Sequence, residues 1–152
     1  KLAPGDAKWL AGAILAGGSL QIENACADYG QALGTAFQVI DDVLDYDGDT
    51  HQMGKNLGDD LREGKATLPL IAAMQRGTPG ERATIRQAIE TGNEADLPQI
   101  IQIVRDTGAL EITRAAAAAE AQRAIDAMEL LPRNGHTEAL LKLAAQLLER
   151  RS

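Results

Sequence analysis

The sequence predicts an all-α fold, a multi-helix bundle formed by a single domain over residues 1–152. No stretch alternates between apolar and polar residues for long enough to form a β-strand. Ala and Leu dominate the apolar residues and only 3% of the chain is aromatic, so we expect helices that pack through small and aliphatic side chains. The 152 residues suffice to bury one core.

The first two helices are separated by glycine. A turn at Pro4-Gly5 is expected to precede a helix that Asp6 caps and that ends at about Ala16. The Gly-Gly-Ser sequence at 17–19 interrupts this helix, and a longer second helix is expected over residues 20–46.

Two glycines, Gly30 and Gly34, lie inside the second expected helix. Since they are four residues apart, they would share one face of the helix and allow a neighbouring helix to approach closely. The alternative is that they are simply two weak points, each less favourable than Ala by about 1 kcal/mol.

Later helices are marked by a cap residue followed by proline and by a closing glycine. A cap with proline in the first turn is a typical helix start, and glycine is typical of the end. These signals, with the apolar stripe of the last helix, predict helices over residues 67–76, 78–91, 96–107, 109–131 and 137–150. The stripe consists of Leu140, Leu143, Ala144, Leu147 and Leu148.

Residues 47–64 are the most polar and least regular segment, and we expect a loop there. Lys55 follows Gly54, and Lys65 follows Gly64. Glycine lets the backbone approach a ligand closely, so the two lysines could neutralise phosphate oxygens. The alternative for either lysine is an ordinary solvated side chain.

Three carboxylates interrupt the apolar end of the second expected helix, at Asp41, Asp42 and Asp45. On a helix, Asp41 and Asp45 share one face, and Asp42 lies about 100° around from Asp41. Each carboxylate faces the negative end of the helix dipole, which destabilises it by about 0.3–1 kcal/mol. A cation would offset this effect, and hard oxygen ligands suit magnesium or calcium. The alternative is a solvated acidic helix end.

Two other motifs are excluded by counting. In an EF-hand loop that starts at Asp45, the glycine would come two places early and Asn56 would replace the final Glu. A Walker phosphate loop needs four residues between its glycines and Ser or Thr after its lysine. Residues 58–67 have five between the glycines, and Ala66 follows the lysine.

Composition excludes some classes of function. A net charge of −7 argues against non-specific binding of nucleic acid, which needs a basic surface. The single Cys26 cannot form an internal disulfide, as expected for a cytoplasmic protein. The most apolar N-terminal stretch, residues 9–15, is too short to span a membrane.

Two longer motifs resemble those of the trans-polyprenyl diphosphate synthases. They are residues 34–46, which contain the three aspartates, and residues 54–70, which contain both Gly-Lys pairs. The similarity continues through residues 108–111 and is nearest to the bacterial octaprenyl diphosphate synthase branch, which makes quinone side chains. It implies the C-terminal portion of an isoprenoid-synthase fold, carrying the second of two aspartate-rich motifs.

The resemblance implies a magnesium-dependent prenyltransferase. Such an enzyme adds isopentenyl diphosphate head to tail to an allylic diphosphate, here expected to be farnesyl diphosphate, and acts as a homodimer. By the same resemblance, Asp41 would bind Mg²⁺ directly, with Asp42 and Asp45 supporting it through water. Lys55 would contact the allylic diphosphate with Lys65 near it, and Phe37 and Gln38 would line the isopentenyl site. Arg150-Arg151 resembles a basic C-terminus that some relatives fold over the site.

Members of this family are about twice as long, and their other half carries the first aspartate-rich motif. We therefore expect this chain alone to be inactive. Members also have a Lys-Thr pair where this chain has Lys1-Leu2, so Lys1 receives no role. One alternative is a non-catalytic helical subunit derived from the same family. A terpene cyclase is another, although the glycine–lysine pairs favour the chain-elongating enzymes.

Overall fold

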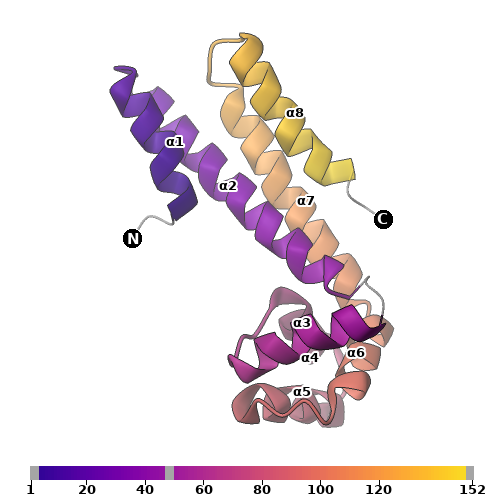
Figure 1. Ribbon diagram of the computed structural model, residues 1–152. Coiled ribbons are helices and arrows are strands. Elements are labelled where there is room, and N and C mark those ends of the chain that lie inside the picture. Colours follow the sequence, from indigo (N-terminus) through magenta and orange to yellow (C-terminus); the bar gives the residue numbers. More distant parts are fainter. Residues whose placement is uncertain (1–3, 47–49, 150–152) are drawn as a thin grey trace. The chain divides into compact units, whose positions relative to one another are not determined.

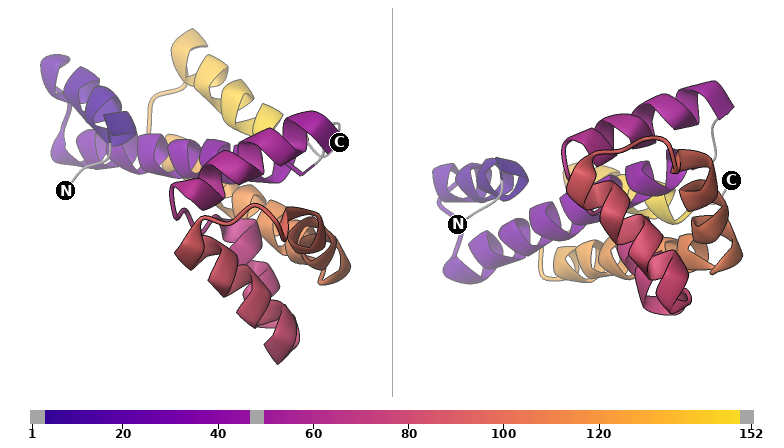
Figure 2. Two further views of the ribbon diagram at one scale, coloured as in Figure 1. Left: turned by 60° about the horizontal axis from the view of Figure 1, so that its bottom comes forward. Right: turned by 90° about the horizontal axis from the view of Figure 1, so that it is seen from below.

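The computed structural model describes residues 4–46 and 50–149, without the side chains of residues 4–7, 50–55 and 148–149. Within this part of the chain it contains eight helices and no strand, which confirms the all-α prediction (Figure 1 and Figure 2). The helices are α1 (Pro4–Leu15), α2 (Leu20–Leu44), α3 (Thr50–Arg62), α4 (Leu68–Arg76), α5 (Pro79–Thr91), α6 (Leu97–Asp106), α7 (Ala109–Met128) and α8 (Gly135–Glu149). None of the described helices is both long enough and apolar enough to cross a membrane.

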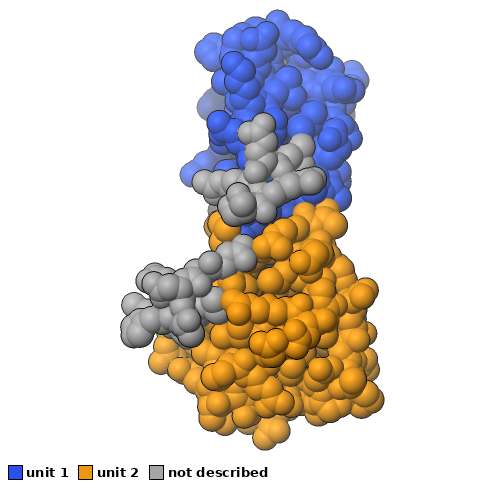
Figure 3. Space-filling view, turned by 90° about the vertical axis from the view of Figure 1, so that its right-hand side faces the viewer, with its two compact units in different colours: residues 1–40, 116–152 blue, residues 41–115 orange. Residues whose placement is uncertain are grey.

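The chain divides into two compact units, each with its own apolar core (Figure 3). Unit 1 comprises Lys1–Ile40 and Ala116–Ser152, and unit 2 comprises Asp41–Ala115. The last turn of α2 and the first turns of α7 therefore belong to unit 2. A single domain over residues 1–152 stays a prediction.

In unit 1, α1 approaches α2 closely because one residue of α2 has no side chain. A Cβ atom on Gly30 would overlap Cδ1 of Trp9. The Trp9 ring meets the ring of Tyr29 edge to face, with 5.1 Å between centroids. The close approach expected of the glycine pair is thus confirmed at Gly30, whereas a Cβ on Gly34 would meet nothing within 4 Å.

The Tyr29 side chain also connects α2 to α8. Its hydroxyl donates a hydrogen bond to the carbonyl oxygen of Leu140, with 2.9 Å between the oxygens. Only 1% of the residue is exposed, and burial raises the pKa of the phenol to about 12. Tyr29 therefore remains a neutral hydrogen-bond donor at any physiological pH.

Gly30→Ala is expected to destabilise the protein by about 1–3 kcal/mol, because the added methyl group has no room beside Trp9. Gly34→Ala is the matched control on the same helix, and it is expected to stabilise α2 by about 0.5–1 kcal/mol. Urea unfolding followed by circular dichroism measures both. If both variants shift the urea midpoint of unfolding in the same direction, the inference that α1 approaches α2 closely at Gly30 is wrong.

The start of α1 differs from the prediction. The helix begins at Pro4, where a turn was expected, and Asp6 lies inside the helix and not at its N-cap. Proline is favoured in the first position of a helix, since its φ angle is already helical and its missing N–H is not needed there. Lys1 lies outside the described residues.

The loop expected over residues 47–64 is wrong, because most of this segment forms α3. Leu57 and Leu61, four residues apart, are both buried in the core of unit 2. Packing of this narrow stripe outweighs the weak helix propensity of the glycines. Gly58 also allows α3 to pass close to Glu94, since a Cβ there would lie 3.0 Å from the Glu94 carboxyl carbon.

The cap signals located α4, α5 and α6 to within a residue or two. Thr78 forms a complete capping box with Glu81 at the start of α5, and Gly92 ends that helix with a left-handed φ of 63°. In unit 2, α4 packs against α5 and α6, and α3 packs against the same two helices.

The last two helices are shifted from their predicted bounds. α7 ends at Met128, three residues early, and α8 begins at Gly135, two residues early. Asn134 caps α8, because its side-chain oxygen accepts a hydrogen bond from the Thr137 backbone N–H at 3.0 Å. The buried face of α8 includes Leu141, whereas Leu143, expected in the stripe, is 36% exposed.

Candidate metal and diphosphate site

The three aspartates lie at the C-terminal end of α2, as predicted. Asp41 and Asp42 are in its last turn, and Asp45 directly follows Leu44. The Asp45 backbone N–H still donates to the carbonyl oxygen of Asp41, at 3.1 Å, so the helical path continues to Asp45. Asp41 is exposed and has no hydrogen-bond or ion-pair partner among the residues that the structure describes. Its carboxylate is therefore available to a ligand.

Asp42 is half-buried and lies beside the N-terminus of α4. Burial raises the pKa of its carboxyl group, and the hydrogen bond from the Leu68 backbone N–H opposes that effect. Repulsion from Asp60, Asp45 and Asp41 raises the pKa further. A divalent cation at this place would remove the repulsion.

Asp45 is held by a residue of the next helix. The Asn56 side-chain amide donates a hydrogen bond to one carboxylate oxygen of Asp45, with 2.7 Å between nitrogen and oxygen. Both side chains are partly buried. This contact joins the end of α2 to α3.

Lys65 is placed beside the same cluster, but its ammonium group is already paired. It lies 2.7 Å from a Glu63 carboxylate oxygen and 3.2 Å from a carboxylate oxygen of Asp60. Glu63 first and Asp60 second raise the pKa of Lys65. A diphosphate would have to compete with these two ion pairs, of which only the one with Glu63 is exposed on both sides.

Two buried hydroxyl groups lie next to the carboxylates, on Tyr46 and Thr67. Neither has a hydrogen-bond partner of ordinary geometry among the described residues. Burial raises the pKa of the Tyr46 phenol, and Thr67 lies close enough to lower it in part. The Tyr46 carbonyl oxygen accepts a hydrogen bond from Arg105 at 3.1 Å, which ties α6 to the end of α2. Thr67 precedes α4 as expected, but its side chain does not cap the helix.

The other predicted site residues either lie on α2 within unit 1 or have side chains outside the described part of the chain. Lys55 belongs to α3, but its side chain lies outside the described residues. Phe37, which is half-buried, and Gln38, which is exposed, lie on α2 within unit 1. Arg150-Arg151 also lies outside the described residues.

Unit 2 thus brings together the aspartate motif and Lys65, and it adds two residues that the sequence did not single out as ligands or supports. Asn56 contacts Asp45, and Asp60 contacts Lys65. The sequence does contain a signal for Asp60, because this acidic residue precedes the Gly64-Lys65 pair by only four residues. The role of Asn56 has no local signal, because its partner is eleven residues away on another helix.

The donor set fits a magnesium ion that also binds phosphate. Among the described side chains, no three or more of His, Cys, Asp and Glu are grouped so as to hold a metal ion by themselves. Mg²⁺ is commonly held by one or two carboxylates, with substrate phosphate oxygens and water completing its coordination. Asp41, a carboxylate without a partner in the described part of the chain, meets that requirement beside two supported carboxylates.

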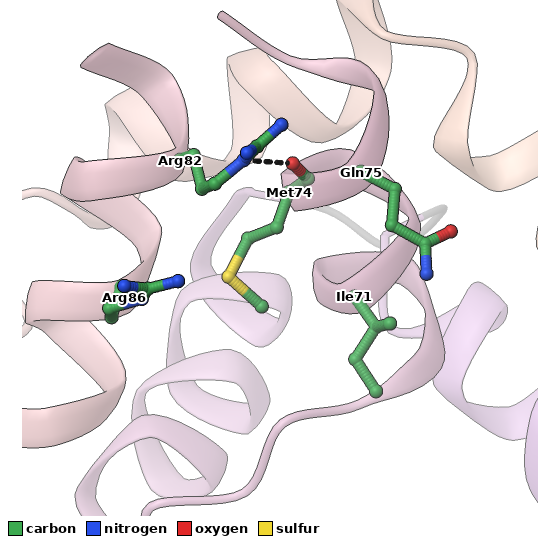
Figure 4. A pocket seen from close by; sticks show the side chains of 5 residues that line it. All are labelled: Ile71, Met74, Gln75, Arg82 and Arg86. Carbon is green, nitrogen blue, oxygen red and sulfur yellow. Dashed lines mark hydrogen bonds between the residues drawn. The ribbon is translucent and has the colours of Figure 1, made fainter. Parts of the chain in front are cut away.

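A separate groove of about 360 Å³ lies between α4 and α5 (Figure 4). It is lined by Ile71, Met74, Gln75, Arg82 and Arg86. The Arg82 guanidinium donates a hydrogen bond to the Met74 carbonyl oxygen at 2.7 Å. None of the predicted site residues lines this groove.

An all-α chain with carboxylates at a helix end and a lysine beside them is suited to binding a metal–diphosphate complex. The chain belongs to the polyprenyl synthetase family, whose model matches residues 7–104. Octaprenyl diphosphate synthase of Haemophilus influenzae is 46% identical over 141 residues, which are 92% of this chain and 43% of that protein. The octaprenyl diphosphate synthase of Escherichia coli K12 is 49% identical over 138 residues, 90% of this chain and 43% of that protein.

Solved structures of the family share the fold. A polyprenyl synthase from Caulobacter crescentus CB15, complexed with calcium and isoprenyl diphosphate, is 43% identical with a TM-score of 0.81 over 97% of this chain and 46% of that one. A geranylgeranyl pyrophosphate synthase from Corynebacterium glutamicum, complexed with isoprenyl diphosphate and magnesium, is 35% identical with a TM-score of 0.73 over 92% of this chain and 41% of that one. This chain therefore spans less than half the length of these relatives.

Proposed function

We propose that this chain is the C-terminal part of a trans-polyprenyl diphosphate synthase and supplies half of its active site. The whole enzyme would add isopentenyl diphosphate head to tail to an allylic diphosphate, with farnesyl diphosphate as the expected starter. The product would be a long polyprenyl diphosphate for quinone side chains. The observation that carries this proposal is Asp41, which is exposed and has no partner among the described residues, beside the supported Asp42 and Asp45.

Asp41 would be the direct ligand of Mg²⁺, and Asp42 and Asp45 would support the ion through water. When bound, the metal would neutralise the charge that develops on the departing diphosphate. In the reaction, the allylic C–O bond breaks, the isopentenyl double bond attacks the allylic carbon, and a proton is lost. Calcium and magnesium in the two solved relatives support a divalent cation.

The two lysines would take the remaining negative charge of the substrate. Lys55 would contact the allylic diphosphate. Lys65 would exchange its ion pairs with Glu63 and Asp60 for phosphate oxygens. The pair with Glu63 is weak because both side chains are largely exposed to water, whereas the Asp60 side chain is only 19% exposed. Phe37 and Gln38 would line the isopentenyl site.

Two further expectations concern the complete enzyme. A homodimer stays a prediction from the family resemblance. A cytoplasmic location stays a prediction that rests on the single Cys26.

The test is incorporation of labelled isopentenyl diphosphate into farnesyl diphosphate with Mg²⁺. We expect no product from this chain alone, and product once the N-terminal part of the Escherichia coli octaprenyl diphosphate synthase is supplied in trans. The missing part would contribute the first aspartate-rich motif, without which the diphosphate is only half neutralised.

Two outcomes would contradict this expectation. Product from the chain alone would show that one aspartate motif suffices. An absence of product in both assays, with both parts folded, would favour the alternative of a non-catalytic helical subunit.

A further inference from the structure

Within the described residues, the Asn56 side-chain amide donates a hydrogen bond to the Asp45 carboxylate and so joins α3 to the aspartate motif. The nitrogen–oxygen distance of 2.7 Å is short for an amide donor and a carboxylate, as expected when the acceptor is ionised. Asp45 lies just beyond the last residue of α2, where backbone hydrogen bonding no longer holds the chain on both sides. The orientation of the Asp45 carboxylate therefore depends on Asn56.

The chemistry of an amide suits this role better than that of a charged donor. An amide carries no net charge, so it directs one carboxylate oxygen without cancelling the negative charge of Asp45. An ammonium or guanidinium group at the same place would neutralise the carboxylate and weaken its attraction for a cation. The second oxygen of Asp45 accepts no hydrogen bond from the described residues and can accept one from metal-bound water.

The three aspartates thus have three different environments. Asp41 has no partner among the residues that the structure describes, Asp42 accepts a hydrogen bond from the backbone of α4, and Asp45 accepts one from the side chain of Asn56. Only the last of these supports can be removed by changing a single side chain outside the motif.

We propose that Asn56 is a positioning residue that orients Asp45 for the divalent cation bound by the aspartate motif. The proposal rests on the metal site of the proposed function and adds a residue to it. Groups that orient metal ligands typically change metal affinity by 10- to 100-fold when they are removed.

The experiment measures binding of Mn²⁺, as a probe for the Mg²⁺ site, to the purified chain in the presence of inorganic pyrophosphate. The concentration of free Mn²⁺ is measured by electron paramagnetic resonance. Asn56→Ala and Asn56→Leu both remove the donor, and Leu keeps the branched shape and the number of side-chain heavy atoms in case Ala fails to fold. Each is expected to weaken Mn²⁺ binding about tenfold.

Gln102→Ala is the matched control within unit 2. The Gln102 amide donates to the Asp106 carboxylate at 2.8 Å, so this variant removes the same kind of hydrogen bond away from the motif. It is expected to leave Mn²⁺ binding unchanged. In an Asp45→Asn background, Asn56→Leu is expected to cause no further loss, because Asn56 acts through Asp45.

The possible outcomes separate this inference from the proposed function. If the unaltered chain binds Mn²⁺ and the folded Asn56 variants bind equally well, the positioning role is wrong while the metal site stands. A further loss in the Asp45→Asn background would also overturn it, since Asn56 would then act by another route. If the unaltered chain binds no Mn²⁺, the metal site itself is wrong, and the inference fails with it.

Discussion

Asp41→Asn is expected to lower kcat/KM of the complemented enzyme by about 10²–10³-fold, because it removes the proposed direct metal ligand and with it much of the stabilisation of the leaving diphosphate. Helix content is expected to stay the same, and the thermal midpoint is expected to stay equal or rise slightly. Asp41 is exposed, and its charge is repelled by the helix dipole and by the neighbouring carboxylates. The same variant is expected to lose Mn²⁺ binding in the chain alone.

Asp126→Asn is the matched control for Asp41→Asn. Asp126 is also an exposed aspartate in the last turn of a long helix, α7, but it belongs to unit 1. It accepts a hydrogen bond from Gln122 at 2.8 Å and lies outside the motif. Its replacement is expected to leave turnover and Mn²⁺ binding unchanged. Equal activity in the two variants would refute the assignment of Asp41 as a ligand.

Ile85→Ala is expected to destabilise the protein by about 2–5 kcal/mol, the largest stability effect we predict. Ile85 lies on α5, is 0% exposed, and packs in the core of unit 2. Removing three carbon atoms there leaves a cavity that the surrounding helices fill only in part. Because small proteins are stable by about 5–15 kcal/mol, this loss is a large share of the total. Urea unfolding measures it.

Ile112→Ala is the control for the core substitution. Ile112 lies on α7, also in unit 2, and is 40% exposed, so it has less buried area to lose and its replacement is expected to cost less than about 1 kcal/mol. Amide hydrogen exchange is expected to accelerate most over residues 41–115 in Ile85→Ala. Similar losses in the two variants would mean that Ile85 does not occupy a close-packed core.

Local signals in the sequence located most of the helices. The capping box of Thr78 with Glu81 and the left-handed Gly92 act within a few residues of the helix ends that they define. The same is true of the aspartates at the end of α2, whose placement follows from the apolar run before them. Where two local signals competed, as at Pro4, the sequence was ambiguous between a turn and the first position of a helix.

The loop prediction is wrong for residues 50–62 because their helix propensity and their packing disagree. Glycine and polar residues outnumber apolar residues in this segment, which favours a loop. Leu57 and Leu61 nevertheless pack in a core to which other helices contribute. The residues of that core come from distant parts of the sequence, so the neighbours of residues 50–62 along the chain do not reveal it. The helix is therefore a consequence of tertiary packing and not of local preference.

The sequence by itself determined the all-α class, the positions of the carboxylates on α2, and the family. Only the tertiary structure decided which carboxylate lacks a partner within the described residues. Asn56 holds Asp45, and the N-terminus of α4 holds Asp42. It also showed that Lys65 is already paired, with Asp60 as one of its partners. The reason is physical: propensities and caps act over a few bonds, whereas the direction of a carboxylate depends on donors from helices that packing brings beside it.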